Sequence, residues 1–206
     1  MNKNIFFSRI LFLSPHPDDI ELGCGGLLSH LSRTDTDMNV IVFSSYFPEA
    51  PDIMKENEEA LSVFKFNNKM ILDIERRQFA DYYNNITDML VQCTKDLNIN
   101  MIFCPSENDI HPDHKTIYQA VKRFWKKDLI CYESPSSNDI SDFNFFVELS
   151  QNDLDKKIEA LGKYDSQIIL NRRYFDPQYI TALAITRGIN INKKYVEAYK
   201  IERMCL

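Results

Sequence analysis

The sequence predicts one α/β domain over residues 1–206, a single-domain, Rossmann-like three-layer sandwich with a mostly parallel sheet. The first observation is size and composition, because 206 residues with 44% hydrophobic and 26% charged side chains are typical of one globular domain. The second is order along the chain, since the first two thirds alternates short apolar runs with longer amphipathic stretches. Such alternation predicts right-handed β-α-β units and therefore a parallel sheet. No repeat, low-complexity stretch or Gly/Ser-rich linker divides the sequence.

Five short apolar runs are the expected strands. Each is rich in Ile, Val, Phe or Leu and lacks strict polar–apolar alternation, which is typical of strands covered on both faces. They span residues 5–13, 39–44, 70–74, 101–104 and 129–132. Four helices are expected between them, over residues 22–32, 51–64, 86–97 and 114–125. In the third helix, Ile86, Met89, Leu90 and Cys93 follow the i, i+3, i+4, i+7 spacing of a core-facing stripe.

The last third of the chain departs from this rhythm. Residues 153–164 are expected to form a helix, residues 171–178 a loop and residues 195–201 a late strand. The apolar character of this third is compatible with a homo-oligomeric interface.

Charge and hydropathy exclude several classes of partner. The net charge is -6 and the Lys and Arg residues are scattered, whereas nucleic acids and anionic membranes both require clustered positive charge. No apolar run approaches the roughly 20 residues of a membrane span. Arg9 divides the first apolar run, and 14–19 follows it where a signal peptide would need small residues, so this run is interpreted as a buried strand.

The five cysteines are odd in number, far apart and without a Cys-x-x-Cys pair. That pattern indicates a reduced, cytoplasmic protein and argues against a disulfide framework or a thiolate zinc site.

Three of the four histidines lie in two similar clusters. Residues 16–21, His-Pro-Asp-Asp-Ile-Glu, follow the first strand, and residues 109–114, Asp-Ile-His-Pro-Asp-His, follow the fourth. In a parallel sheet, ligands bind just beyond the carboxyl ends of the strands, so both clusters are expected at the functional edge.

Imidazole and carboxylate are natural ligands of Zn²⁺ and related divalent ions. His16 and Asp19 from the first cluster and His114 from the second would complete a two-His, one-carboxylate site. Asp18 would then lie beside the metal without being a ligand, which is a suitable place for a general base.

Helix capping is the alternative interpretation. Asp18 and Glu21 have the spacing of a capping box, and Asp113 could cap the helix that begins near His114. Capping does not require histidine at both turns, however, so the pair of clusters favours a metal site.

With these residues identified, the sequence resembles a known family. His16-Pro17-Asp18-Asp19-x-Glu21-x-Gly23 with a distant His111-x-Asp113-His114 is similar to the signature of the LmbE/PIG-L-like deacetylases. Members of that family are zinc-dependent enzymes that hydrolyse the N-acetyl group of N-acetylglucosamine-type sugars. The resemblance covers most of the chain, and residues 163–167 resemble a family segment that usually reads His-x-Ser-Gln.

The resemblance implies a role for each matching residue. His16, Asp19 and His114 would be the metal ligands, and Asp18 the general base. His111 would stabilise the oxyanion, and Asp113 would set the orientation and protonation of His111. The implied substrate is a small-molecule N-acetylated amino sugar or sugar conjugate. The implied cofactor is Zn²⁺, with Fe²⁺ as another divalent ion of suitable chemistry.

The substrate-recognition residues depart from the family pattern. An Arg of the family that contacts substrate is replaced by Lys55, and the usual Thr-Asp-Gly after the second strand is replaced in the stretch that contains Tyr46. Arg76 and Arg77 follow the third strand, and either one of them contacts an anionic group of the substrate or both are solvated. These four residues are the predicted substrate contacts, and no specific substrate follows from them.

Two other functions are compatible with the same residues. A metal-containing sugar-binding module without turnover would keep the ligands but lose hydrolysis. A non-haem iron oxygenase would also use a two-His, one-carboxylate site, but that chemistry usually lies in an all-β barrel.

Overall fold

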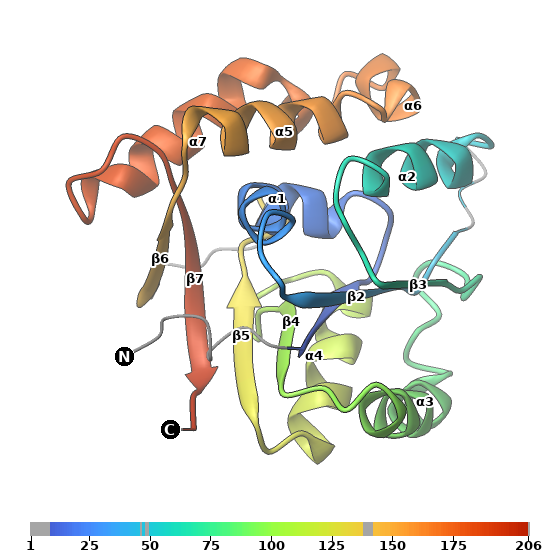
Figure 1. Ribbon diagram of the computed structural model, residues 1–206. Helices are drawn as coiled ribbons and strands as arrows, with labels where there is room; N and C mark the ends of the chain where they lie inside the picture. Colours follow the sequence, from blue (N-terminus) through green and yellow to red (C-terminus); the bar gives the residue numbers. More distant parts are fainter. Residues whose placement is uncertain (1–8, 46, 48–49, 138–141, 206) are drawn as a thin grey trace.

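A computed structural model describes residues 9–45, 47, 50–137 and 142–205. Seven strands form one mixed sheet in the order β3-β2-β1-β4-β5-β7-β6 (Figure 1). Their bounds are β1 (Arg9–Ser14), β2 (Asp37–Val42), β3 (Asn68–Ile71), β4 (Met101–Pro105), β5 (Asp128–Tyr132), β6 (Phe145–Glu148) and β7 (Val196–Arg203). The first five strands are parallel, and β7 is antiparallel to both β5 and β6. The predicted α/β class with a mostly parallel sheet is therefore confirmed.

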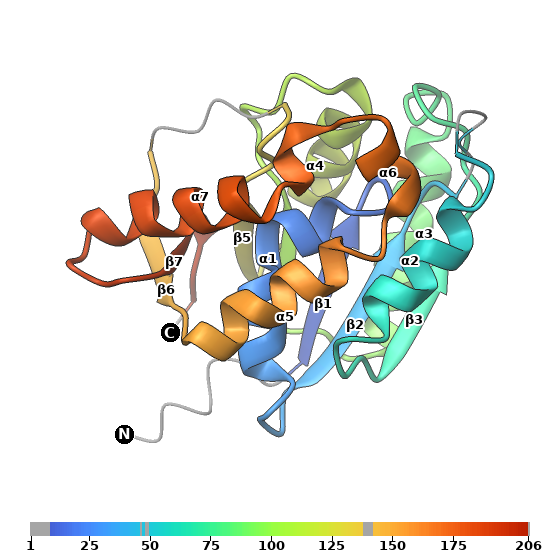
Figure 2. The same ribbon diagram turned by 90° about the horizontal axis from the view of Figure 1, so that it is seen from above.

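Helices cover both faces of the sheet. They are α1 (Asp19–Leu31), α2 (Ile53–Leu61), α3 (Tyr83–Asp96), α4 (Pro112–Phe124), α5 (Gln151–Leu161), α6 (Asp165–Ile169) and α7 (Pro177–Ile189), with a 3-10 turn η2 (Arg173–Phe175). Helices α3 and α4 lie on one face, and α1 and α2 lie on the other (Figure 1). Helices α5, α6 and α7 pack over α1 and α2 (Figure 1 and Figure 2). The C-terminal third thus adds a helical layer on the side of α1.

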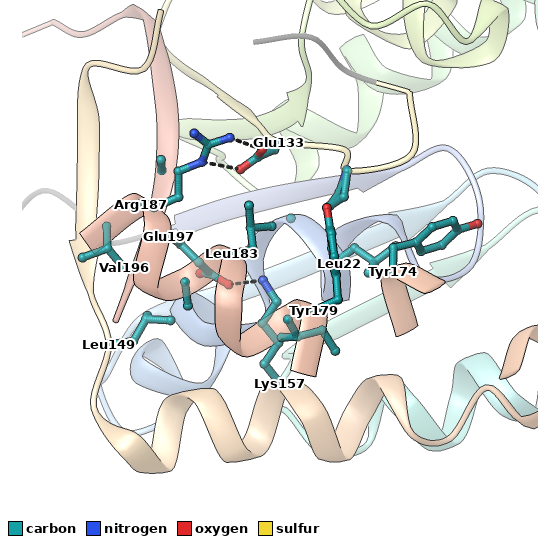
Figure 3. Close-up of a pocket in the computed structure, with 15 residues that line it drawn as sticks. Leu22, Glu133, Leu149, Lys157, Tyr174, Tyr179, Leu183, Arg187, Val196 and Glu197 are labelled. Carbon is teal, nitrogen blue, oxygen red and sulfur yellow. Dashed lines mark hydrogen bonds and ion pairs between the residues drawn. The ribbon is translucent and has the colours of Figure 1, made fainter. Parts of the chain in front are cut away.

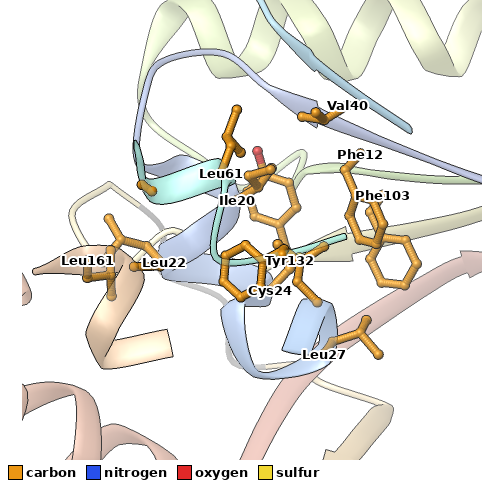
Figure 4. Close-up of a cluster of buried hydrophobic side chains, with 14 of the residues drawn as sticks. Phe12, Ile20, Leu22, Cys24, Leu27, Val40, Leu61, Phe103, Tyr132 and Leu161 are labelled. Atoms are coloured by element: carbon orange, nitrogen blue, oxygen red, sulfur yellow. The ribbon is translucent and has the colours of Figure 1, made fainter. Parts of the chain in front are cut away.

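Two apolar cores explain why the strands lack alternation. Successive residues of β1 point to opposite faces, so Phe12 packs with Leu27 and Phe103 in one core (Figure 4). Leu11 packs with Leu90 of α3 in the other core. Because both faces are buried, both sets of positions are apolar.

The C-terminal third contains elements that the sequence did not predict. The expected helix over 153–164 is α5 and the expected late strand is β7. The expected loop over 171–178 is wrong, since it contains η2 and the start of α7. Helix α7 has the local signals of a helix start, because the Asp176 side chain accepts from the Gln178 amide at 2.8 Å and Pro177 is its first residue. Strand β6 was also missed.

A buried carboxylate joins the last strand to the middle of α1. Glu197 of β7 accepts from the amides of Gly26 and Leu27, each at 2.8 Å. It also accepts from Lys157 Nζ and from the Tyr199 hydroxyl, both at 2.7 Å. Figure 3 shows Lys157 and Glu197 beside a small cavity under α7. At about 20 Å³ that cavity is far too small for a sugar.

Some apolar side chains of the C-terminal helices are exposed. They include Ile168 and Ile169 of α6 and Ile185 and Ile189 of α7. The predicted homo-oligomer stays a prediction. Within the described ranges, no helix has both the length and the hydropathy that crossing a membrane requires.

Candidate metal centre

The two His-Pro-Asp clusters meet at the centre of the sheet edge. Strands β1 and β4 are neighbours, although β2 and β3 separate them along the chain. The sheet continues from β1 toward β2 on one side and toward β4 on the other, which makes this pair the topological switch point. Loops at such a point form the ligand crevice of an open parallel sheet.

Three side-chain atoms form a nearly equilateral triangle there. His16 Nδ1 lies 3.4 Å from Asp19 Oδ2, and His114 Nε2 lies 3.2 Å from each of them. Tetrahedral ligands at about 2.0–2.1 Å from Zn²⁺ are themselves about 3.3–3.4 Å apart. All three residues are buried. The spacing and chemistry of these atoms therefore fit a divalent cation.

The remaining ring nitrogens of the two histidines are held by carboxylates. His16 Nε2 lies 2.9 Å from Asp113 Oδ2, which also accepts from the Arg77 amide at 2.8 Å. His114 Nδ1 lies 2.7 Å from Asp109 Oδ2. A carboxylate behind a ligating histidine fixes the ring and its tautomer, as in many zinc sites. Asp109 belongs to the second cluster, and no sequence pattern marks it as the partner of His114.

His111 lies beside the triangle. Its ligand atom is within 4.8 Å of those of His16 and His114, so these three imidazoles form a second set that could hold an ion. His111 Nδ1 accepts from the Asp113 amide at 3.2 Å, which caps α4 and leaves Nε2 as the protonated nitrogen of the neutral ring. Burial, with the charges of His16 and His114, lowers the pKa of His111 to about 4.

Asp113 contacts His111 through its backbone and not through its side chain. The Asp113 carboxylate is 3.9 Å from His111 Nδ1, beyond hydrogen-bond distance, and contacts His16 instead. The contact with His111 is made by the Asp113 backbone amide.

Asp18 is buried in an unusual backbone conformation. Its φ is 91°, in the left-handed region that non-glycine residues rarely adopt. Burial, followed by the charges of Asp19 and Glu21, raises the pKa of Asp18 well above its ordinary value. The guanidinium of Arg172 acts in the opposite direction.

The capping alternative is wrong at both turns. Asp18 is the residue before α1, but its side chain makes no cap hydrogen bond. Glu21 instead accepts from the Tyr164 hydroxyl at 2.8 Å, and burial raises the pKa of Glu21 to about 7. In α4 the capping side chain is His111, not Asp113.

The electrostatics of the triangle favour a positive charge. Burial lowers the pKa of His114, but the charge of Asp19 and the hydrogen bond that the His114 ring donates to Asp109 outweigh burial and raise that pKa to about 10. Burial likewise opposes ionisation of Asp19, yet His114 and His16 hold the pKa of Asp19 far below its ordinary value. A site that stabilises an imidazolium so strongly suits a cation.

Two of the four predicted substrate contacts lie near the triangle. The Arg76 guanidinium is 4.3 Å from the centre of the Phe47 ring, and that ring lies edge-on to His16 at 6.1 Å. Arg77 contacts Asp113 through its backbone amide and has a φ of 66°.

Of the other two predicted contacts, Lys55 is not brought to the triangle. Lys55 has a side chain 78% exposed and pairs with Glu59 one helical turn away at 3.8 Å. Tyr46 lies outside the described residues.

The C-terminal third supplies a residue near the site that sequence reasoning missed. Arg172 Nη1 donates to the Tyr174 hydroxyl at 3.1 Å, and the charge of Arg172 acts on Asp18. It falls in the segment predicted as a loop, and no motif marked it.

Comparisons with known proteins find similar sequences and folds. Residues 11–125, more than half of the chain, match the family model described as PIG-L: GlcNAc-PI de-N-acetylase. The uncharacterized deacetylase YaiS of Escherichia coli is 26% identical over 167 residues, covering 76% of this chain and 90% of that protein.

Solved structures share the fold. The conserved protein TT1542 from Thermus thermophilus has a TM-score of 0.77 at 22% identity, with 96% of each chain covered. The N,N'-diacetylchitobiose deacetylase from Pyrococcus horikoshii has a TM-score of 0.73 at 17% identity, covering 94% of this chain and 83% of the other.

Proposed function

Because the chain belongs to the PIG-L family of de-N-acetylases, we propose that it is a metal-dependent deacetylase that acts on an N-acetylglucosamine-type amino sugar or its conjugate. The observation that carries the metal dependence is the triangle of His16 Nδ1, Asp19 Oδ2 and His114 Nε2, with sides of 3.2–3.4 Å. Its donor set of two imidazoles and one carboxylate matches that of catalytic zinc sites.

His16, Asp19 and His114 would hold Zn²⁺, or another divalent ion such as Fe²⁺. When bound, such an ion acts as a Lewis acid that polarises a carbonyl and makes water more acidic. Asp109 and Asp113 each lie at the ring nitrogen that points away from the triangle, so the nitrogen of each imidazole that faces the triangle is the one that would bind the ion.

Asp18 is the proposed general base. A buried carboxylate with a raised pKa accepts a proton from the attacking water and then gives it to the leaving amine more readily than an ordinary aspartate. Its backbone conformation fixes it beside Asp19 without making it part of the triangle.

His111 is the proposed oxyanion stabiliser. Its Nδ1 is occupied by the Asp113 amide, so a neutral ring presents Nε2–H to the carbonyl oxygen that becomes negative during attack. The lowered pKa keeps this ring neutral at physiological pH.

For substrate recognition, Arg76 and Arg77 remain the supported contacts. The Arg76 guanidinium is ordered by Phe47 close to His16 and suits an anionic or hydroxyl-rich group. Lys55 is less suitable because of its exposure and its pairing with Glu59.

A free-amine assay over a panel of N-acetylated amino sugars and nucleotide sugars tests the proposal. Metal-loaded protein should release amine from at least one of them, and a chelator should abolish release. Asp18→Asn should keep the metal but lose roughly two to four orders of magnitude in rate. Asp88→Asn, at an exposed position of α3, is the matched control.

Two outcomes would contradict this function. Normal turnover by Asp18→Asn would remove Asp18 from the reaction. Calorimetric binding of a sugar by metal-loaded protein without any amine release would instead indicate a binding module.

A further inference from the structure

A buried phenol links three separate parts of the chain close to the metal centre. The Tyr164 hydroxyl donates to Glu21 Oε1 of α1 at 2.8 Å and accepts from Asn57 Nδ2 of α2 at 2.7 Å. All three side chains are at most 1% exposed. Tyr164 directly precedes α6, so one hydroxyl connects the C-terminal layer with both α1 and α2.

Glu21 lies in the first turn of α1. That turn directly follows Asp18, the residue with the left-handed backbone conformation. The Leu22 amide donates to the Asp18 carbonyl at 2.9 Å, which makes Asp18 the first acceptor of the helix. A non-glycine residue at positive φ persists only where its surroundings fix it. The side chain of Asp18 contributes no cap bond to that turn.

The turn is held from both sides. On the side of β1, the His16 amide donates to Asp19 Oδ2 at 2.8 Å. On the helix side, Glu21 accepts from the Tyr164 hydroxyl of the C-terminal layer, and Asp19 Oδ2 lies 3.2 Å from His114 Nε2 of α4.

We propose that Tyr164 is a positioning residue, which acts through Glu21 to hold the first turn of α1 and thereby keeps Asp18 in its left-handed conformation. Without the hydroxyl, Glu21 would lose its donor and the turn could relax toward an ordinary backbone geometry, which would displace the Asp18 carboxylate. The catalytic consequence rests on the proposed function of Asp18, whereas the structural consequence does not.

The chain offers a closely matched control. Tyr199 is also fully buried, and its hydroxyl donates to Glu197 at 2.7 Å. Glu197 in turn accepts from the amides of Gly26 and Leu27, in the middle of α1. Tyr199→Phe therefore removes the same kind of Tyr–Glu hydrogen bond, here within β7, from a glutamate that is bonded to the middle of α1 and not to the turn that contains Asp18.

Hydrogen exchange and kinetics on the full chain would test the proposal. Both Tyr164→Phe and Tyr199→Phe should lower the melting temperature. Only Tyr164→Phe should speed exchange of the Leu22 amide, by roughly tenfold or more. With an accepted substrate, it should lower kcat by roughly tenfold or more with KM nearly unchanged and metal content retained.

Variants of the partner residues keep the test decisive if Tyr164→Phe does not fold. Glu21→Gln retains an acceptor oxygen and should keep slow exchange at Leu22, whereas Glu21→Leu should lose it. Asn57→Leu removes a donor to Tyr164 but leaves the bond to Glu21, so exchange at Leu22 should change little.

Unchanged exchange at Leu22 in Tyr164→Phe, or equal losses of kcat in the two tyrosine variants, would overturn the inference. If the parent protein turns over no substrate, the proposed function fails, and the exchange comparison still decides whether Tyr164 holds the turn.

Discussion

The carboxylate of Asp109 lies 2.7 Å from Nδ1 of His114, while Nε2 of the same ring lies 3.2 Å from Asp19. His16 is placed in the same way, between Asp113 at Nε2 and Asp19 at Nδ1. Each imidazole therefore has one nitrogen turned toward the triangle and the other held by a carboxylate outside it. This arrangement gives Asp109 a role that can be measured separately from catalysis.

Asp109→Asn should weaken metal binding about 10–100-fold while leaving the fold intact. The amide keeps the shape and an acceptor oxygen, but it lacks the charge that stabilises the proton on His114 Nδ1. Competition with a chromophoric chelator measures the affinity, and Asp88→Asn serves as the control. An affinity equal to that of the parent would show that Asp109 does not support the ligand.

Arg172→Gln should move the acid limb of the kcat/KM profile to higher pH. The guanidinium lowers the pKa of Asp18, so its removal lets burial and the neighbouring carboxylates raise that pKa further. Asp18 would then be protonated at pH values where it is ionised in the parent. Arg173→Gln, at the exposed neighbouring position, should leave the profile in place. A shift of the acid limb to lower pH would contradict the conclusion that Arg172 lowers the pKa of Asp18.

Gly23→Ala should destabilise the protein by about 1–3 kcal/mol. At an exposed helical position the same change usually stabilises a protein by about 1 kcal/mol, because alanine has the higher helix propensity. A Cβ at Gly23 would lie 2.6 Å from Tyr132 Cδ2 and 2.9 Å from the Glu133 carbonyl oxygen. The Tyr132 ring cannot move aside freely, because it is buried and its hydroxyl donates to the Leu13 carbonyl. Chemical denaturation measures the change.

Gly162→Ala is the comparison for that prediction. A Cβ built at Gly162 would lie 3.2 Å from its nearest neighbour, the Ile158 carbonyl oxygen, and the φ of Gly162 is -68°. A loss at Gly162 as large as that at Gly23 would show that contact with β5 is not the cause.

The stability of the protein should fall in acid partly because of Asp153. Its carboxylate accepts from Ser29, Ser150 and Arg33 at 2.6–2.9 Å. Burial opposes ionisation, but the hydrogen bonds from Ser150, Arg33 and Ser29 outweigh it and lower the pKa of Asp153. Because the pKa of Asp153 is lower in the folded state, its ionised form stabilises the protein at pH values above the unfolded-state pKa of about 3.9. This stabilisation is lost as the pH falls through the folded-state pKa.

Asp153→Asn should therefore cost roughly 1–3 kcal/mol at pH 7, and the difference from the parent should shrink below about pH 4. Urea titrations at pH 7 and pH 3 measure both values. Asp155→Asn, on the exposed side of the same helix, should show a smaller effect at pH 7. If the stability difference between Asp153→Asn and the parent grew on acidification, the folded-state pKa of Asp153 would not be lowered as stated.

The meeting of the two His-Pro-Asp clusters could be predicted because it depends on the order of the strands along the sequence. His16 and His114 follow apolar strands, and parallel strands bring their carboxyl ends to one edge. The same reasoning failed for Glu21, whose spacing from Asp18 suggested a capping box. Its actual partner, Tyr164, is 143 residues away, and no local pattern encodes such a contact.

The C-terminal third was harder to predict for a related reason. Helix α7 is rich in Ile, Ala and Thr on several faces, so its sequence lacks a clear apolar stripe. Strand β6 has only four residues and pairs with β7 alone. Arg172 reaches the site because α6 and η2 pack over α1, which is a tertiary event that spacing cannot reveal.

The bonds from Glu197 to Gly26 and Leu27 span 171 and 170 residues. During translation, α1 therefore leaves the ribosome long before Glu197, whose carboxylate accepts the hydrogen bonds from the amides in the middle of that helix. Lys157, too, leaves the exit tunnel without its counter-charge, which follows 40 residues later. Although both His-Pro-Asp clusters precede residue 125, the nascent chain should not reach a protease-resistant state until β7 has emerged.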